Sequence, residues 1–292
     1  LRTKTALLTT SLVLVLLGAT GWWQYRQLST EFVSLMREQQ QALAQSAADD
    51  LDYKLRMHQA ILTRAARQID AQTFTNPAAQ QRFFAESDLR AMFDGTALIA
   101  LDGTMIAVDP PGTKAVNVAD RDYFRLARGA AAPAISAPLL ARPNNQPAVV
   151  MAGPVKDPHR RKIGVVAAAL SLQRPNVLGN LSRAPVGRGG YYVVVTRGSS
   201  PVFVAHPDAN LLLQRASKAA VPAEHPTRSD LITEAWIPSA DWEMRVVVPA
   251  HTAYAPCSSR EGASCCRCYG LAWAAQSSSG WVLPGSCAPW RR

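Results

Sequence analysis

The segment Asp120-Arg121-Asp122-Tyr123-Phe124 combines residue types that can hold a small anion. Arg121 offers a planar fork of N–H donors that matches a carboxylate, and Tyr123 offers a ring face and a hydroxyl. Asp120 or Asp122 can cap the start of a helix, which would hold these side chains at its first turn. In the alternative interpretation, Arg121 pairs with an aspartate of the segment, while Tyr123 and Phe124 are ordinary core residues.

Arg142 and Asn144 lie in a polar segment between two apolar runs, so they are further candidates for the rim of a pocket. Simple exposure to solvent is the alternative for both. The candidate ligand-binding residues are therefore Arg121, Tyr123, Phe124 and Arg142.

The chain lacks the residue patterns of several common enzyme classes. It has no Gly-rich phosphate loop before a helix and no Gly-x-Ser-x-Gly turn. We therefore expect no enzyme activity, no catalytic residue, no metal site and no cofactor. The histidines, which show no metal-ligand spacing, are His58, His159, His206, His225 and His251.

Apolar runs separated by polar reversals predict an antiparallel sheet that carries the candidate site. The dipeptide Asp102-Gly103, typical of a tight hairpin, separates the first two runs. A helix over residues 120–129 is expected to cross between strands. The five expected strands are Thr96–Leu101, Thr104–Val108, Ala134–Ala141, Ala148–Val155 and Lys162–Leu172.

A shorter version of the same pattern follows in the sequence. The dipeptides Asp102-Gly103 and Arg197-Gly198 are 95 residues apart, and Asp109-Pro110 and His206-Pro207 are 97 residues apart. This nearly constant offset indicates duplication of one small α/β module. The expected strands of the second module are Gly190–Thr196, Pro201–Ala205, Leu231–Ile237 and Trp242–Val248.

The residues before the first module predict a membrane anchor. As a helix, the uncharged run Ala6–Trp23 would extend about 27 Å, close to one hydrocarbon thickness. A cleavable signal peptide is the alternative, but the run ends in Trp22-Trp23 instead of small residues of the Ala-x-Ala kind. Arg2 and Lys4 favour a cytoplasmic N-terminus, so the remainder is expected in the periplasm.

From Gln24 to Ala71, apolar residues recur at steps of three or four, which predicts one long amphipathic helix. Its apolar stripe can pack on its own sheets, on the same helix of a second copy, or on each in different segments. We therefore expect a homodimer formed through this helix.

The chain has 292 residues, a formal net charge of +10 and a pI near 9.7. Its basic residues are scattered without interleaved aromatic residues, so we expect a solvated surface, some membrane attraction and no nucleic-acid partner. All five cysteines lie between Cys257 and Cys287, without zinc-ligand spacing. The abrupt change of composition there predicts a tail read out of frame; a natural cysteine-rich tail is the alternative.

The order of these segments resembles the double Cache sensor domain of bacterial transmembrane receptors. This resemblance implies an α/β fold, with an N-terminal transmembrane helix and a long stalk helix before two PAS-like Cache modules with antiparallel sheets. It also implies ligand binding in the membrane-distal first module. The pattern is most similar to receptors linked to diguanylate cyclases, although the cyclase motif Gly-Gly-Asp-Glu-Phe is absent. The resemblance rests on residues Asp120–Phe124, Pro147–Val155, Ile163–Val166, Gly187–Tyr191, Ala205–Asp208 and Trp242–Val246.

The sequence departs from the amino-acid-binding members of this family. Those members have a tyrosine five residues before the arginine and an aspartate in the last strand of the first module. Here the positions hold Val116 and the run Ala167-Ala168-Ala169, so nothing negative is expected there to hold an ammonium group. The expected ligand is therefore a small anionic metabolite, such as an organic acid.

The expected function is that of a ligand-sensing periplasmic domain, anchored in the inner membrane by a single pass, of a receptor whose output domain is missing. The alternative is a structural or dimerisation module that binds no ligand. The expected regions are the anchor (1–26), the stalk helix (27–75), the membrane-distal module (76–180), the membrane-proximal module (181–250) and the atypical tail (251–292).

Overall fold

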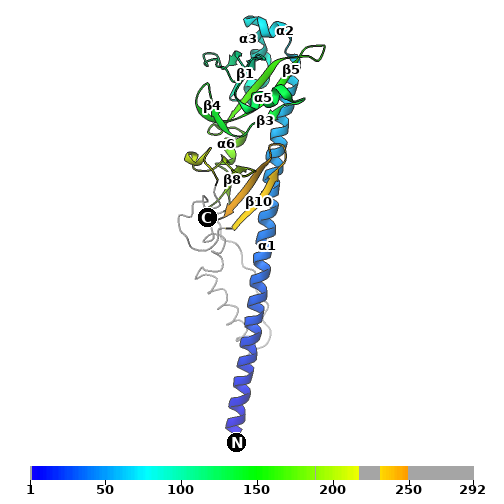
Figure 1. Ribbon diagram of the computed structural model, residues 1–292. Coiled ribbons are helices and arrows are strands. Elements are labelled where there is room, and N and C mark those ends of the chain that lie inside the picture. The colour runs from blue at the N-terminus through cyan, green and yellow to red at the C-terminus, as the bar shows by residue number, and fades with distance from the viewer. Residues whose placement is uncertain (1, 188, 217–230, 249–292) are drawn as a thin grey trace, which may run out of the picture.

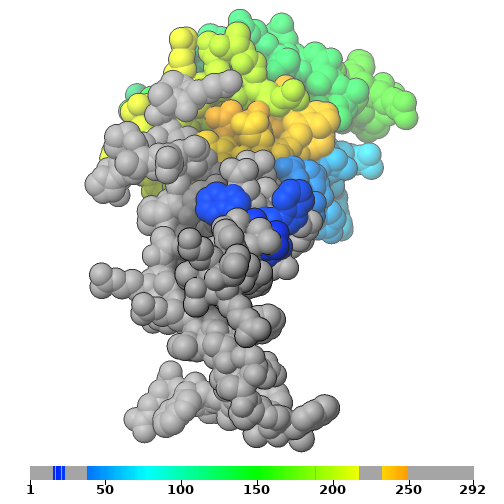
Figure 2. All heavy atoms as spheres, turned by 90° about the horizontal axis from the view of Figure 1, so that it is seen from below, coloured from blue at the N-terminus to red at the C-terminus, as the bar shows by residue number. Residues whose placement is uncertain are grey.

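The computed structural model describes residues 2–187, 189–216 and 231–248, which form a long helix, two antiparallel sheets and several short helices (Figure 1). Within the long helix, side chains are described at residues 16, 18–20, 22 and 23 and from residue 38 onward. Seen from below in Figure 2, the second sheet (yellow to orange) lies in front of the first (green). The predicted tail, residues 251–292, lies outside the described residues.

Helix α1 continues without a break over Arg2–Gln68, and its C-terminal half lies beside both sheets (Figure 1). No Gly or Pro occurs between Gln24 and Gln68, so no residue there interrupts the helical hydrogen bonds. The helix ends just before Asp70, whose side chain accepts a hydrogen bond from the Thr73 N–H and caps the next helix. The predicted long helix is thus confirmed, but it ends at Gln68, before the predicted Ala71, and residues 71–75 form a separate helix.

Among the described residues, no helix is long and apolar enough to cross a membrane. Most side chains of the predicted span, residues 6–23, are not among those described, so the span stays a prediction.

The first sheet has six strands in the order β2-β1-β6-β5-β3, and β4 also pairs with β5. The single strand predicted over Ala134–Ala141 is wrong. The Val150 N–H is bound by the Ser136 hydroxyl, and Pro138 has no N–H for the ladder, so the run divides into two short strands. The strands are β1 Gly95–Ile99, β2 Met105–Asp109, β3 Ala134–Ile135, β4 Leu139–Ala141, β5 Gln146–Lys156 and β6 Lys162–Ser171.

The second sheet repeats the topology of the first. Strand β8 has β11 on one side and β9 on the other, with β10 outside β11, just as β1 lies between β6 and β2 with β5 outside β6. Each module is thus a hairpin joined to a second hairpin, as the predicted duplication requires. The strands are β7 Pro185–Val186, β8 Gly190–Thr196, β9 Phe203–Ala205, β10 Leu231–Ile237 and β11 Trp242–Val248.

Short helices connect these elements. Helix α5 contacts the first sheet, and α6 lies between the two modules (Figure 1). The short helices are α2 Ala71–Thr75, α3 Pro77–Glu86, α4 Leu89–Met92, α5 Asp122–Gly129, α6 Val177–Leu181 and the 3-10 turn Ala209–Leu211.

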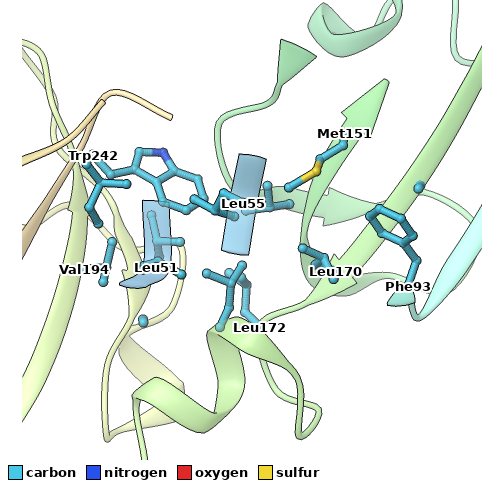
Figure 3. Close-up of a cluster of buried hydrophobic side chains, with 14 of the residues drawn as sticks. Leu51, Leu55, Phe93, Met151, Leu170, Leu172, Val194 and Trp242 are labelled. Carbon is cyan, nitrogen blue, oxygen red and sulfur yellow. The ribbon is translucent and has the colours of Figure 1, made fainter. Parts of the chain in front are cut away.

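One apolar cluster joins α1 to the inner faces of both sheets. In Figure 3, Leu55 of α1 lies between Trp242 of the second sheet and Met151 of the first, and Leu51 lies beside Trp242. All four side chains are at most 2% exposed. Burial of each leucine stabilises the fold by about 1.5–3 kcal/mol relative to exposure. The shared helix therefore holds the two modules in one core.

The opposite face of each sheet has its own smaller cluster. On the first sheet, Phe124 and Ala127 of α5 pack in a cluster with Ile99 and Val165. Because α1 covers much of the inner faces, the outer face of each sheet has room for a ligand.

Trp242→Ala should lower the free energy of unfolding by about 3–5 kcal/mol, because it removes a buried indole from the core shared with α1. Trp236→Ala is the matched control. Its side chain is 52% exposed and contacts the Arg197 guanidinium, so its loss should cost about 1 kcal/mol or less. Chemical denaturation of the full chain in detergent measures both values, and equal losses would contradict this assignment of the core.

Candidate functional site

A cavity of about 280 Å³ lies on the outer face of the first sheet, away from α1. Its floor comes from adjacent strands: Ala97 of β1, Ala167 of β6 and Val150 of β5. Short alanine side chains leave space here that larger residues would fill. The start of α5 and the turn between β4 and β5 form the polar wall, with Arg121, Tyr123, Ala141, Arg142, Asn144 and Gln146.

Three of the four predicted site residues line this cavity: Arg121, Tyr123 and Arg142. Phe124 is not among the lining residues of the cavity. Its ring is 1% exposed and belongs to the core cluster beneath α5. Adjacent positions on a helix point in directions about 100° apart, so Tyr123 and Phe124 have different surroundings.

The start of α5 differs from the sequence-based expectation. The N-cap residue is Arg121, in extended conformation and without a side-chain cap, so the predicted carboxylate cap from Asp120 or Asp122 is wrong. Asp122 instead forms an ion pair with Arg125 on the exposed side of the helix. Arg121 therefore stands just outside the helix, where its side chain reaches the cavity.

Arg121 has no ion-pair partner among the described residues. Its single recorded side-chain hydrogen bond is a long one, 3.4 Å from Nη2 to the Leu140 carbonyl oxygen. A guanidinium group has five N–H donors, so most of the Arg121 donors are free to bind a ligand. The pairing of Arg121 with an aspartate, left open by the sequence, does not occur here.

Arg142 is the paired arginine of the site. Its Nη1 and Nη2 donate to the two carboxylate oxygens of Asp120 at 2.8 and 2.7 Å, and Nη1 also donates to the Asn117 carbonyl oxygen at 2.6 Å. The hydrogen bonds from Arg142 hold the pKa of Asp120 below its usual value. This pair fixes the turn between β4 and β5 against the residues before α5.

Two carboxylates line the cavity from outside the run Ala167–Ala169, the positions at which the sequence predicted nothing negative. Asp109, at the end of β2, is buried and accepts two hydrogen bonds from Arg90 Nε at 3.0 and 2.9 Å. Asp94 precedes β1 and accepts from the Ser171 N–H at 2.8 Å and from Asn176 Nδ2 at 2.7 Å. Asp109 is therefore fully paired, whereas Asp94 Oδ1 accepts no hydrogen bond from a described residue and lies 3.9 Å from Nη1 of Arg174, which also lines the cavity.

Tyr123 is buried, and its hydroxyl makes no recorded hydrogen bond to a described residue. Burial raises the pKa of the phenol above its usual value, while the nearby positive charges of Arg121 and Arg142 oppose this rise. Arg121 and Tyr123 therefore offer N–H and O–H donors to one anionic group, whereas Arg142 is already paired with Asp120.

Comparisons with known proteins show the fold. The ligand-binding domain of the Pseudomonas fluorescens chemoreceptor CtaA in complex with L-isoleucine matches with a TM-score of 0.60 and 19% identity, over 77% of this chain and 97% of that one. That of the Pseudomonas aeruginosa receptor PctB in complex with L-Arg matches with a TM-score of 0.59 and 19% identity, over 75% and 97%. That of PctC from the same organism in complex with GABA matches with a TM-score of 0.58 and 16% identity, over 73% and 100%.

No family model matches the sequence, and no curated protein matches it. The likeness to these chemoreceptor domains confirms the predicted double Cache architecture at the level of fold. The predicted similarity to cyclase-linked receptors stays a prediction.

The raised pKa of Tyr123 should make stability depend on alkaline pH. The neutral phenol is favoured in the folded state, so its contribution is complete below the unfolded pKa, near 10, and is lost as pH rises through the raised folded pKa. The free energy of unfolding should therefore fall above about pH 10, and Tyr123→Phe should reduce the fall.

Urea denaturation between about pH 9 and pH 11 measures this dependence. Tyr53→Phe is the control, because Tyr53 is exposed on α1. The same pH dependence for the wild type and for Tyr123→Phe would show that burial of this phenol is not its cause.

Proposed function

We propose that this chain is the extracytoplasmic ligand-sensing domain of a bacterial membrane receptor, and that its cavity binds a small organic acid through Arg121. The observation that supports this most directly is a guanidinium group that lines a cavity without an ion-pair partner among the described residues. A carboxylate is the planar anion that matches such a group with two parallel hydrogen bonds.

The lining of the cavity supports a short apolar body behind that carboxylate. Ala97, Ala167 and Val150 form the floor, with Met105 and Val108 beside them. Small-molecule sites commonly combine such an apolar lining with a few polar groups that fix orientation. An acid of four to six carbon atoms has this combination of one charged end and a compact apolar remainder.

An organic acid is favoured over an amino acid because both carboxylates of the cavity already have partners that an ammonium group would have to share or displace. Asp109 is held by Arg90, and Oδ2 of Asp94 by Ser171 and Asn176. The Arg174 guanidinium lies 3.9 Å from the remaining Asp94 oxygen, where its charge opposes an ammonium group. The ligands in the three similar structures, L-isoleucine, L-Arg and GABA, each carry a carboxylate and an amine. They therefore support recognition of a carboxylate in this fold, and the amine is the group to be tested.

Helix α1 supports the proposed receptor architecture. This helix packs against both modules, so a change in the first sheet can reach the predicted membrane span through a single rigid element. Leu43, Tyr53 and Met57 are exposed large apolar side chains of α1, and they lie within about a quarter of a turn around its axis. We include a homodimer through this side of the stalk in the proposal.

Arg121→Ala should weaken binding of an organic acid by about 10- to 100-fold, because it removes a charge-assisted pair of hydrogen bonds. Arg125→Ala is the matched control, since Arg125 pairs with Asp122 on the same helix and does not line the cavity. Thermal melting of the full chain across a panel of organic acids and amino acids identifies binders, and calorimetry measures their dissociation constants.

Matched compounds decide which group is recognised. 3-Methylbutanoate, its amide and valine share a carbon skeleton and differ in the carboxylate or the amine. We expect the acid to bind, the amide to bind far more weakly, and valine to gain nothing from its amine. Tighter binding of valine would refute the organic-acid part of the proposal, and no binding across the whole panel would favour a structural module.

The membrane topology can be tested independently. Alkaline phosphatase fused after Val248, the last residue of β11, should be active, and green fluorescent protein at the same point should be dim, because the basic N-terminus stays in the cytoplasm. The reverse pattern would place the sheets on the cytoplasmic side and exclude an extracytoplasmic sensor.

A further inference from the structure

Seven basic side chains from three separate segments gather at the end of the first module that is farthest from the N-terminus. They come from the last turns of α1, the end of α5 and the hairpin between β5 and β6, which extends past α1 in Figure 1. The sequence predicted scattered basic residues, and folding brings these together. We name this set the distal basic surface: Arg64, Arg67, Arg128, Lys156, Arg160, Arg161 and Lys162.

Direct contacts connect the three segments. Lys162 Nζ donates a hydrogen bond to the Arg128 carbonyl oxygen, which joins the hairpin to α5. Arg67 of α1 and Lys156 of β5 line one small cavity, which joins α1 to the hairpin. The surface is therefore continuous.

The positive charge of the distal basic surface is largely uncompensated. Asp157 lies within it and pairs with Arg161 at 2.8 Å. The other six side chains have no ion-pair partner among the described residues, and all but Lys162 belong to exposed residues. Such a concentration of one charge produces a field that attracts anions.

A concave site is built into this surface. The cavity between Arg67 and Lys156 has a volume of about 160 Å³ and is completed by Thr63, Ala66, Ala131, Pro133 and Pro154. No carboxylate lines it. The Arg67 guanidinium and the Lys156 ammonium group on a pocket of this size match a single tetrahedral oxyanion such as a phosphate or sulfate group. The Thr63 hydroxyl already donates to the Gln59 carbonyl oxygen at 2.7 Å.

The composition of the surface favours a flexible polymer over a folded protein partner. Protein interfaces normally have an apolar, aromatic-rich centre. Among the described residues, neither the hairpin nor α1 beyond Arg64 has an exposed large apolar side chain, and α5 has just Leu126. No Phe, Tyr or Trp is exposed there among the described residues, and His159 is the one exposed ring of the hairpin, which also disfavours stacking along a single-stranded nucleic acid.

We propose that the distal basic surface binds a linear polymer carrying phosphate or sulfate groups, one of which occupies the cavity between Arg67 and Lys156. From Gln24 to Gln68, α1 spans about 65 Å, so this surface lies far from any lipid bilayer that holds the N-terminus. The proposed partner is therefore an anionic polymer outside the membrane, separate from the ligand of the cavity beside α5.

The test compares two triple variants with the same change of charge. Arg67→Glu, Lys156→Glu and Arg160→Glu alter the distal basic surface, whereas Lys114→Glu, Arg183→Glu and Arg215→Glu alter exposed basic residues elsewhere. The full chain in uncharged detergent is titrated with long-chain polyphosphate and with heparin. The first variant should bind at least about tenfold more weakly than the wild type, and the control within about threefold, because the lost charge pairs are local.

Titrations with other anionic molecules show which kind of molecule the distal basic surface prefers. Binding to polyphosphate or heparin should exceed binding to polyglutamate, a single-stranded oligonucleotide and vesicles of anionic lipid. Equal weakening of binding in the two triple variants would show that net charge alone causes the binding, and would overturn the proposal. Preferential binding of the oligonucleotide or of the vesicles would also overturn it. Thermal melting of both variants confirms that they remain folded, and absence of binding by the wild type would also overturn the proposal.

Discussion

The packing of one continuous helix against the inner faces of two sheets determines the rest of this structure. Leu51, Leu55 and Leu62 of α1 are buried in a cluster that includes Trp242 of the second sheet and Met151 of the first. A short α/β module buries little apolar surface alone, and a shared helix gives both modules a common core. Because α1 takes the inner faces, the outer faces are left for binding, and a change at either sheet acts on the same rigid element.

The cavity beside α5 follows from this division of the sheet faces. Alanines at positions 97 and 167 leave space beneath α5, and Arg121 enters it as the N-cap residue just outside the helix. The Arg142–Asp120 and Arg90–Asp109 pairs neutralise most of the other charges nearby, and Arg174 lies 3.9 Å from Asp94, whereas Arg121 has no ion-pair partner among the described residues. An unpaired guanidinium group beside an apolar floor raises the free energy of the empty site. A bound anion removes this cost and forms charge-assisted hydrogen bonds with the group.

Much of the fold could be predicted from local sequence rules. Asp102-Gly103 correctly predicted the first hairpin. The turn requires glycine because Gly103 has a φ of +89°, and a Cβ there would lie 2.5 Å from the Ala119 nitrogen. The candidate site was found in part, since periodicity and residue type do not tell which loops meet. Phe124 lies in the core, and the carboxylates of Asp94 and Asp109 reach the cavity from the ends of strands. Arg142 forms an ion pair with Asp120 instead of being exposed to solvent alone. These are tertiary relations, as is the gathering of basic residues at the distal end.

The measurement that tests the central claim most directly is a crystal structure of the protein with its tightest-binding organic acid. The account predicts the acid in the cavity beside α5, with both carboxylate oxygens about 2.7–2.9 Å from the Arg121 guanidinium nitrogens. It also predicts that the Tyr123 hydroxyl points to the same group and that the Arg142–Asp120 pair is intact. An acid bound in the second module, or in this cavity with Arg121 still directed at the Leu140 carbonyl oxygen, would contradict the account.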